Sequence, residues 1–527
     1  MRSSPVLLWA SPLLRSASVS LTLAVLGCGT AASVCGCFVD ECLETLECED
    51  SPGPPARVCQ ADPSSGTAED GCGVFVSASV GDDAGPGTRA QPVRTLAVAI
   101  SLAQSGAMRV YACAEVFPEA VTVPSGVEVW GGLDCARDWI YVGADRPTVL
   151  APEPDIIPLQ VKGGAGISTL ADLRIEAADA SLPGGSSIAM LVHPGAAAAV
   201  RRSELIAGDG ADGSPGEQGG DGPATGGTSG WTGGPTCSAN VVPGGPAVVT
   251  SCDDGNTVGG EGGDGEVSAG GDGLYGQPEP QPNPDAWGIG GSGETAGMQC
   301  HSGEDGFNGT DGAHGLGSRG AGRITADGWE AERGGSGGNG RPGQGGGGGG
   351  GSRGGSLYCG PGPETPKGGA SGGSGGGGGC GGKGGTGGGY GGASIGLISF
   401  SGDVSLEATS IVTGNGGDGG AGGLAQLGGA QGLAGLGGAS AGGSHAGCRG
   451  GDGGAGGNGG YGGGGLGGPS IGVAHLIGQP AALHGSAVQI GAPGKGGPGG
   501  NQAVDGSAGE DGLRGDTVAF PLQSMAP

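Results

Sequence analysis

Two serine motifs are the first candidates for catalysis in this chain. Both match Gly-x-Ser-x-Gly, the turn that exposes the nucleophile of many hydrolases, at residues 334–338 and 372–376. Such a turn needs a strand before it and a helix after it, and glycine-rich sequence surrounds both motifs. With 139 glycines in 527 residues these spacings arise by chance, and the Gly-x-Gly-x-x-Gly matches carry no weight for the same reason.

Carboxylates and histidines are the next candidates, as acid–base groups or metal ligands. Residues 259–264 fit the first six positions of a calcium-binding nonapeptide, but Glu266 then stands where an apolar residue belongs. Asp253 and Asp254 form a pair inside a glycine tract. The six histidines are scattered without a close pair, at positions 193, 301, 314, 445, 475 and 484. We therefore predict no catalytic residue, no metal site and no cofactor.

Cysteines offer a different chemistry, disulfide formation. Of 15 cysteines, five lie within residues 35–59 and another follows at position 72, a density typical of a stapled extracellular module. Paired Cys-x-x-Cys motifs and nearby histidines are missing, which argues against zinc. The disulfide candidates are Cys35, Cys37, Cys42, Cys48, Cys59, Cys72, Cys113, Cys135, Cys237, Cys252, Cys300, Cys359, Cys380 and Cys448. Sequence does not define their connectivity.

The chain opens with a targeting segment. Arginines precede an apolar stretch at residues 19–26, which is too short to span a bilayer. It runs into Val-Leu-Gly-Cys at residues 25–28, which resembles the lipobox of bacterial lipoproteins. The resemblance implies cleavage before Cys28 and lipidation of its thiol, and Gly29 at the next position implies the outer membrane. The alternative is simple secretion, with cleavage near residues 31–32.

Composition excludes some partners. The net charge is −29, with 22 basic against 51 acidic residues, and no basic stripe is present to neutralise phosphates. We therefore expect no nucleic-acid partner. Glycine adds nothing to an apolar core and loses the most backbone entropy on ordering, so the core must come from well under half of the chain.

A unit of about 20 residues appears three times. The copies open at Ile188, Ile395 and Ile471, and each closes at a glycine 20, 19 and 20 residues later. A unit this short must stack on neighbours to bury its apolar face, which indicates a solenoid. We expect the three isoleucines to lie in register and to face one apolar interior. Residues 209–393 and 415–469 would then be insertions at one corner of the stack.

Elements between residues 72 and 175 must build the rest of this stack. Residues 94–104 are predicted to form a short helix, because Leu96, Ala99, Ile100 and Ala103 share one helical face. Short β-rich runs surround it, separated by Gly and Pro. They lie at residues 72–77, 110–113, 121–123, 127–130, 149–150, 159–161 and 173–175.

Residues 72–135 resemble the start of secreted right-handed parallel β-helix proteins of the pectin-lyase-like superfamily, in the branch without an assigned activity. The motifs are Gly-Thr-x-x-x-Pro-x-x-Thr-Leu at 87–96, RVYAC at 109–113 and VEVWGGL at 127–133. The resemblance implies an all-β parallel solenoid whose first coil is capped by the helix at 94–104. Cys113 and Cys135 stand about one coil apart, and they either pair across adjacent coils or pair elsewhere.

The glycine tracts show two sequence patterns. Glycine falls at every third residue in 210–222 and 303–315, runs too short for a collagen triple helix. Elsewhere the pattern is Gly-Gly-x, which suits an extended left-handed helix with three residues per turn and two faces free of side chains. Such helices would pack closely and share backbone hydrogen bonds. The competing prediction, which low hydrophobicity favours, is low-complexity, disordered or loosely packed chain stapled by cysteines.

Function follows from this organisation. We expect a non-enzymatic scaffold or adhesion-type lipoprotein, in the outer membrane or extracellular. Its partners would be the membrane, through the lipid anchor, and envelope or extracellular polysaccharide or other surface proteins. The alternative is a carbohydrate-active polysaccharide lyase or hydrolase with an unrecognised site. The predicted parts are 1–27 signal peptide, 28–66 cysteine-rich module, 67–208 first β-helix part, 209–393 insertion, 394–414 coil, 415–469 insertion, 470–491 coil and 492–527 glycine-rich tail.

Overall fold

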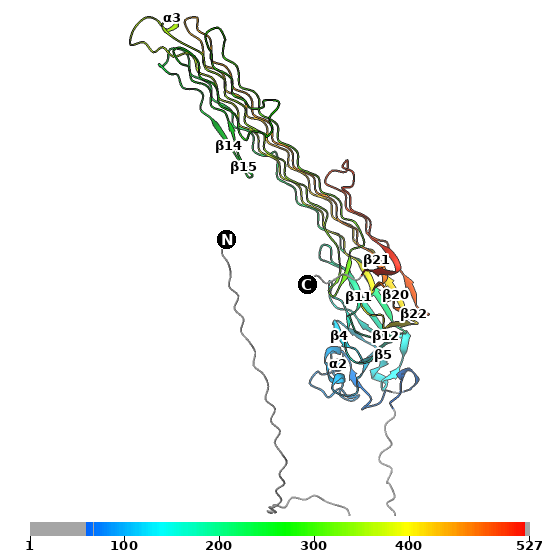
Figure 1. The fold of residues 1–527 in the computed structure, drawn as a ribbon. Helices are drawn as coiled ribbons and strands as arrows, with labels where there is room; N and C mark the ends of the chain where they lie inside the picture. The colour runs from blue at the N-terminus through cyan, green and yellow to red at the C-terminus, as the bar shows by residue number, and fades with distance from the viewer. Residues whose placement is uncertain (1–58, 67, 522–527) are drawn as a thin grey trace, which may run out of the picture. The chain divides into compact units, whose positions relative to one another are not determined.

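The computed structural model describes residues 59–66 and 68–521, and one compact unit begins at Cys59. The predicted leader, Cys28 and the four cysteines at positions 35, 37, 42 and 48 lie outside the described residues. The fold is all-β: most strands join three parallel sheets, and the described helices are few (Figure 1). None of these helices is long and apolar enough to cross a membrane.

Three parallel sheets hold the strands of the core. Sheet A contains β1 (Val74–Val76), β2 (Arg109–Cys113), β5 (Glu128–Asp134), β9 (Ser168–Ala171), β12 (Ala198–Arg201), β19 (Val404–Glu407) and β22 (Ala482–His484), and β6 (Ile140–Tyr141) pairs antiparallel with β5. Sheet B contains β3 (Val116–Phe117), β7 (Thr148–Leu150), β10 (Leu173–Ala177), β13 (Glu204–Ala207), β20 (Ser410–Thr413) and β23 (Ala487–Gln489). Sheet C contains β4 (Val121–Pro124), β8 (Leu159–Lys162), β11 (Ser187–Val192), β18 (Ser394–Ser399), β21 (Ser470–Leu476) and β24 (Arg514–Phe520).

The chain visits the sheets in a fixed order. From β2 to β24 it passes through sheets A, B and C in turn six times. The glycine tracts leave after β13 and β20 in sheet B and return at β18 and β21 in sheet C, so both occupy the same corner, as expected. Residues 492–513 fill this corner a third time before β24. The predicted glycine-rich tail, residues 492–527, therefore also contributes a strand, β24, to sheet C.

The repeat places its isoleucines in register. Ile188 pairs with Ile395, and Ile395 pairs with Ile471, across β11, β18 and β21. This prediction is confirmed. The expectation that they face the shared interior is wrong, because they belong to a second apolar cluster with Trp329. Trp329 lies in a hairpin of the first insertion, which covers the other face of sheet C.

The first apolar cluster fills the space between the sheets. It contains residues of all three, such as Val110, Ile175 and Met190. Helix α2 (Leu96–Gln104) adds Leu96, Ala99, Ile100 and Ala103, all buried as the sequence predicts. It covers the end of the cluster beside β1, β2 and β4, while the Thr95 side chain caps its N-terminus by accepting a hydrogen bond from the Val98 N–H.

The glycine tracts are ordered, and the expectation of disorder or loose packing is wrong. Residues 209–393, 415–469 and 492–513, here called the glycine bundle, run side by side as extended segments (Figure 1). Gly376 donates its N–H to the carbonyl of Gly451, and Gly379, three residues on, donates to Gly454. The step of three is the period of the polyproline II helix, which has no internal hydrogen bonds and leaves its backbone groups to neighbours.

The number of glycines per triplet follows the number of packed faces. In the all-glycine run, a methyl group on Gly345, Gly346 or Gly347 would lie closer than 3.0 Å to a backbone oxygen of three different segments. In a Gly-Gly-x triplet, Gly416 and Gly417 are buried and the third residue is exposed. In the tract 303–315 only every third residue is packed, which explains the collagen-like texture.

Five disulfides cross-link the described residues. Three join distant parts of the glycine bundle, with sequence separations of 122, 128 and 148 residues. Cys59 pairs with Cys72 across the predicted module boundary at residue 66, and Cys113 pairs with Cys135, one of the two alternatives left open by the sequence. The pairs are Cys59–Cys72, Cys113–Cys135, Cys237–Cys359, Cys252–Cys380 and Cys300–Cys448.

The remaining elements are short. The bundle carries two antiparallel hairpins and a one-turn helix, and three 3-10 turns lie within the described residues 59–66 and 68–150. These are β14 (Val248–Cys252) with β15 (Gly255–Gly259), β16 (Arg323–Thr325) with β17 (Gly328–Glu330), α3 (Ser356–Cys359), η1 (Pro63–Ser65), η2 (Cys135–Arg137) and η3 (Gly143–Asp145).

Candidate interaction surface

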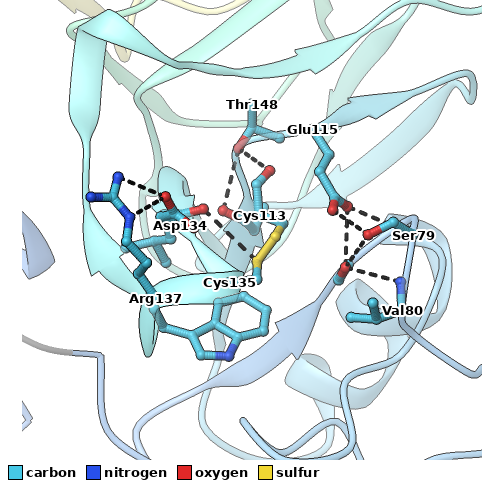
Figure 2. The surroundings of a disulfide bond; sticks show 12 residues. Ser79, Val80, Cys113, Glu115, Asp134, Cys135, Arg137 and Thr148 are labelled. Atoms are coloured by element: carbon cyan, nitrogen blue, oxygen red, sulfur yellow. Dashed lines mark hydrogen bonds and ion pairs between the residues drawn. A yellow bond between two sulfur atoms is a disulfide. The ribbon is translucent and has the colours of Figure 1, made fainter.

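Two carboxylates flank the Cys113–Cys135 disulfide beside a hollow of about 200 Å³ (Figure 2). Glu115 accepts hydrogen bonds from the Ser77 hydroxyl at 3.1 Å and the Ser79 N–H at 3.2 Å. Asp134 points toward Arg137, and its Oδ2 lies 2.8 Å from Arg137 Nη2. Paired carboxylates are the machinery of glycoside hydrolysis, so this hollow is the first place to look for an enzyme.

The charges around Asp134 do not suit a general acid. The hydrogen bond from Arg137, together with the positive charges of Arg137 and Arg146, holds the pKa of Asp134 below its ordinary value. A glycosidase acid needs the opposite, a pKa raised by an apolar setting. Glu115 is occupied by the two serines, which tie the loop after β1 to the start of β3. Both carboxylates therefore serve the local structure.

The Asp253–Asp254 pair lines a second hollow, of about 300 Å³, in the glycine bundle. Lys383 Nζ lies 2.8 Å from Asp253 Oδ2, and its hydrogen bond lowers the pKa of Asp253. Both side chains are mostly exposed to solvent. An exposed carboxylate neutralised by an ammonium has neither the raised pKa of an acid nor a protected cavity in which to act.

The buried Asp172 carboxylate is bonded to Arg202 and Tyr141, and Arg202 extends this network to Asp62. The Asp172 carboxylate lies 2.7 Å from Arg202 Nη2, and it accepts a hydrogen bond from the Tyr141 hydroxyl at 2.7 Å. Arg202 also pairs with Asp62 at 3.1 Å. Burial, followed by the hydrogen bond to Asp172, raises the pKa of Tyr141 to about 12. The network fixes the segment around Asp62 to sheet A and offers no free base.

The sequence motifs have structural explanations. The Ser374 hydroxyl is buried and accepts a hydrogen bond from the Trp231 N–H at 2.8 Å, and the Ser336 hydroxyl accepts from Gly387. The nonapeptide-like residues pack inside the bundle, where Asp264 accepts from the Gly244 N–H at 2.9 Å. In the described part of the chain, no three His, Cys, Asp or Glu side chains are grouped to hold a metal ion.

Ladders of acidic and amide side chains organise the outer surface of the bundle. Asp212 Oδ1 accepts the N–H of Asp418 at 2.7 Å, and Asp418 Oδ1 accepts the N–H of Lys495 at 2.6 Å. A second ladder joins residues 305–314 to 452–461 with the same step of three. At these third positions the N–H finds its acceptor in a side chain of the adjacent segment. Part of the acidic charge is therefore structural.

Sequence reasoning missed these ladders, although Asp and Asn recur at third positions of several tracts. The signal was present, but the acceptor role depends on which segments are neighbours. The bundle thus presents rows of exposed side chains, and Glu115, Asp134 and Asp253 are each bound to a neighbouring side chain. Searches against known protein families, curated proteins and solved structures find no match for this chain.

Proposed function

We propose that this protein is a non-enzymatic scaffold of the adhesion type, built on a right-handed parallel β-helix. The repeated A–B–C order of parallel strands supports the β-helix. Its right-handed sense is supported by the observation that parallel crossovers are right-handed in nearly all proteins. The resemblance of residues 72–135 to the pectin-lyase-like superfamily agrees with this proposal. Lipidation at Cys28 would anchor the scaffold in the outer membrane, and secretion is the alternative.

One observation carries the proposal: the glycine bundle is ordered and displays its third-position side chains in rows. An ordered array of exposed side chains offers little to a single small ligand, since binding pockets are concave and largely apolar. It offers many equivalent contacts to an extended or repetitive partner, such as a polysaccharide of the envelope or matrix. Binding should therefore be weak at each contact and strengthened by multivalency.

A test needs to measure binding and turnover on the same samples. The full-length chain is applied to arrays of plant, algal and bacterial polysaccharides, and the same polymers are incubated with it, with and without calcium. The amount of bound scaffold should fall steeply as the polymer on the array is diluted. The scaffold should release no new reducing ends or unsaturated products.

Substitutions in the two hollows separate the alternatives. Asp253→Asn and Asp134→Asn remove the carboxylates that a lyase or hydrolase would need, and a scaffold should keep its binding in both variants. Reproducible depolymerisation by the natural chain that either substitution abolishes would overturn the scaffold function. A failure to bind any polymer or envelope fraction would overturn the adhesive role.

A further inference from the structure

One tract of the glycine bundle differs from the rest in charge. Residues 419–448 contain no Asp, Glu, Lys or Arg, in a chain whose net charge is −29. The same tract carries four leucines that are 48% to 62% exposed, here called the leucine ridge. Its members are Leu424, Leu427, Leu433 and Leu436.

The four leucines share one face of their segment. Each carbonyl oxygen accepts an N–H from the same adjacent segment, residues 219–233. Glycines between the leucines, such as Gly429 and Gly435, are buried against neighbouring backbone, while the leucines are exposed. With a rise of about 3.1 Å per residue, leucines three positions apart stand roughly 9 Å apart along a straight line.

The order of side chains along the ridge is the same from either end. Its third positions run Ala421, Leu424, Leu427, Ala430, Leu433, Leu436 and Ala439. This order is symmetric about Ala430, and it arises from a nine-residue repeat at 422–430 and 431–439. A two-fold contact between identical chains requires a surface that is complementary to itself when reversed. The ridge has this property without any adjustment of register.

We propose that the leucine ridge is a self-association surface, on which a second copy of this chain docks antiparallel. Leu424 would face Leu436 of the second copy, and Leu427 would face Leu433. The net charge of −29 makes two copies repel, and the uncharged tract is a place where they can approach. Among the charges near the ridge, Arg449 pairs with Asp452 and Lys383 pairs with Asp253, while Asp221 lies on the adjacent segment.

The size of the ridge sets the strength of the contact. Stable interfaces bury roughly 800 Å² on each partner, and four half-exposed leucines supply less than this. The dimer should therefore be reversible and concentration-dependent, and salt should favour it by screening the net charge. The proposal does not depend on the ligand of the scaffold. Two joined copies would double the displayed surface and raise avidity.

Association is measured by sedimentation of the full-length chain over a range of concentrations, at low and high salt. Leu427→Glu/Leu433→Glu should weaken the dimer more than tenfold, because it places like charges face to face. Leu182→Glu/Leu316→Glu is the matched control, since these leucines are 62% and 66% exposed and lie off the ridge. The control should associate like the natural chain, and all variants should keep its circular dichroism.

The antiparallel register has its own test. Leu427→Lys/Leu433→Glu puts opposite charges face to face and should dimerise more tightly than Leu427→Glu/Leu433→Glu. A photoreactive residue at position 424 should cross-link to residues 433–439 of a second copy, identified with isotope-mixed protein. One at position 430 should cross-link to its own counterpart.

Three outcomes would overturn the proposal. A natural chain that stays monomeric at every concentration and salt level excludes a dimer of this kind. Equal weakening by ridge and control substitutions would show that the leucines are not the contact. A monomer that binds lipid vesicles or an apolar polymer through the ridge would assign the surface to a foreign partner. Each result leaves the polysaccharide test of the scaffold unaffected.

Discussion

Replacing one glycine in the centre of the bundle tests whether the tracts are ordered. Gly346→Ala adds a methyl group that would lie closer than 3.0 Å to the backbone oxygen of Gly451. The obstacle is backbone, which cannot turn aside as a flexible side chain does. The matched control is Gly226→Ala in the same bundle, where the nearest atom would be 3.5 Å away, an ordinary contact.

The magnitude follows from two opposing effects. Overpacking a tight site costs about 1–3 kcal/mol. Replacing glycine by alanine also restricts the unfolded chain, which stabilises the folded state by about 0.4–1 kcal/mol. Gly346→Ala should therefore destabilise its surroundings by about 1–2 kcal/mol, a factor of about 5–30 in local opening. Gly226→Ala meets no steric conflict and should be neutral or slightly stabilising.

Amide hydrogen exchange, read by mass spectrometry, measures this opening directly. Exchange in the tract 334–352 should accelerate about 5–30-fold in Gly346→Ala and should not accelerate in Gly226→Ala. Gly345→Ala and Gly347→Ala should behave like Gly346→Ala, because all three faces of this run are packed. Unprotected amides in the natural chain, or equal exchange in Gly346→Ala and the control, would refute the close-packed bundle.

Three further predictions concern separate parts of the chain. Cys300→Ser/Cys448→Ser opens a loop of 148 residues and should lower the free energy of unfolding by about 3–5 kcal/mol. The thermal midpoint should fall, and reducing agent should lower it less in this variant than in the natural chain. Tyr141 should titrate at about pH 12, by ultraviolet absorbance, and Tyr141→Phe should lack this step. Because its folded pKa lies above the ordinary value of 10.0, its stabilising bond to Asp172 should be fully present below pH 10 and lost as pH rises through 12. Cys28→Ser should move the protein from the detergent phase to the aqueous phase, and an unchanged partition would contradict lipidation.

Local sequence was enough to predict the helix and the strands that bury an apolar face. Leu96, Ala99, Ile100 and Ala103 define a helix because their spacing matches 3.6 residues per turn, whatever lies beyond. The register of Ile188 with Ile395 followed from a repeated unit that must stack on its own kind. Sequence also contained the leucine ridge as a nine-residue repeat, although it does not show which face is exposed.

Only the tertiary structure decided the state of the glycine tracts. A polyproline II helix forms no hydrogen bonds within itself, so its order depends on neighbours that supply donors and acceptors. The same composition suits a flexible coil when those neighbours are absent. The direction of the isoleucines was predicted wrongly for a similar reason, since the hairpin that carries Trp329 comes from an insertion distant in sequence. Contacts between residues far apart in the chain fixed both, and no local pattern encodes them.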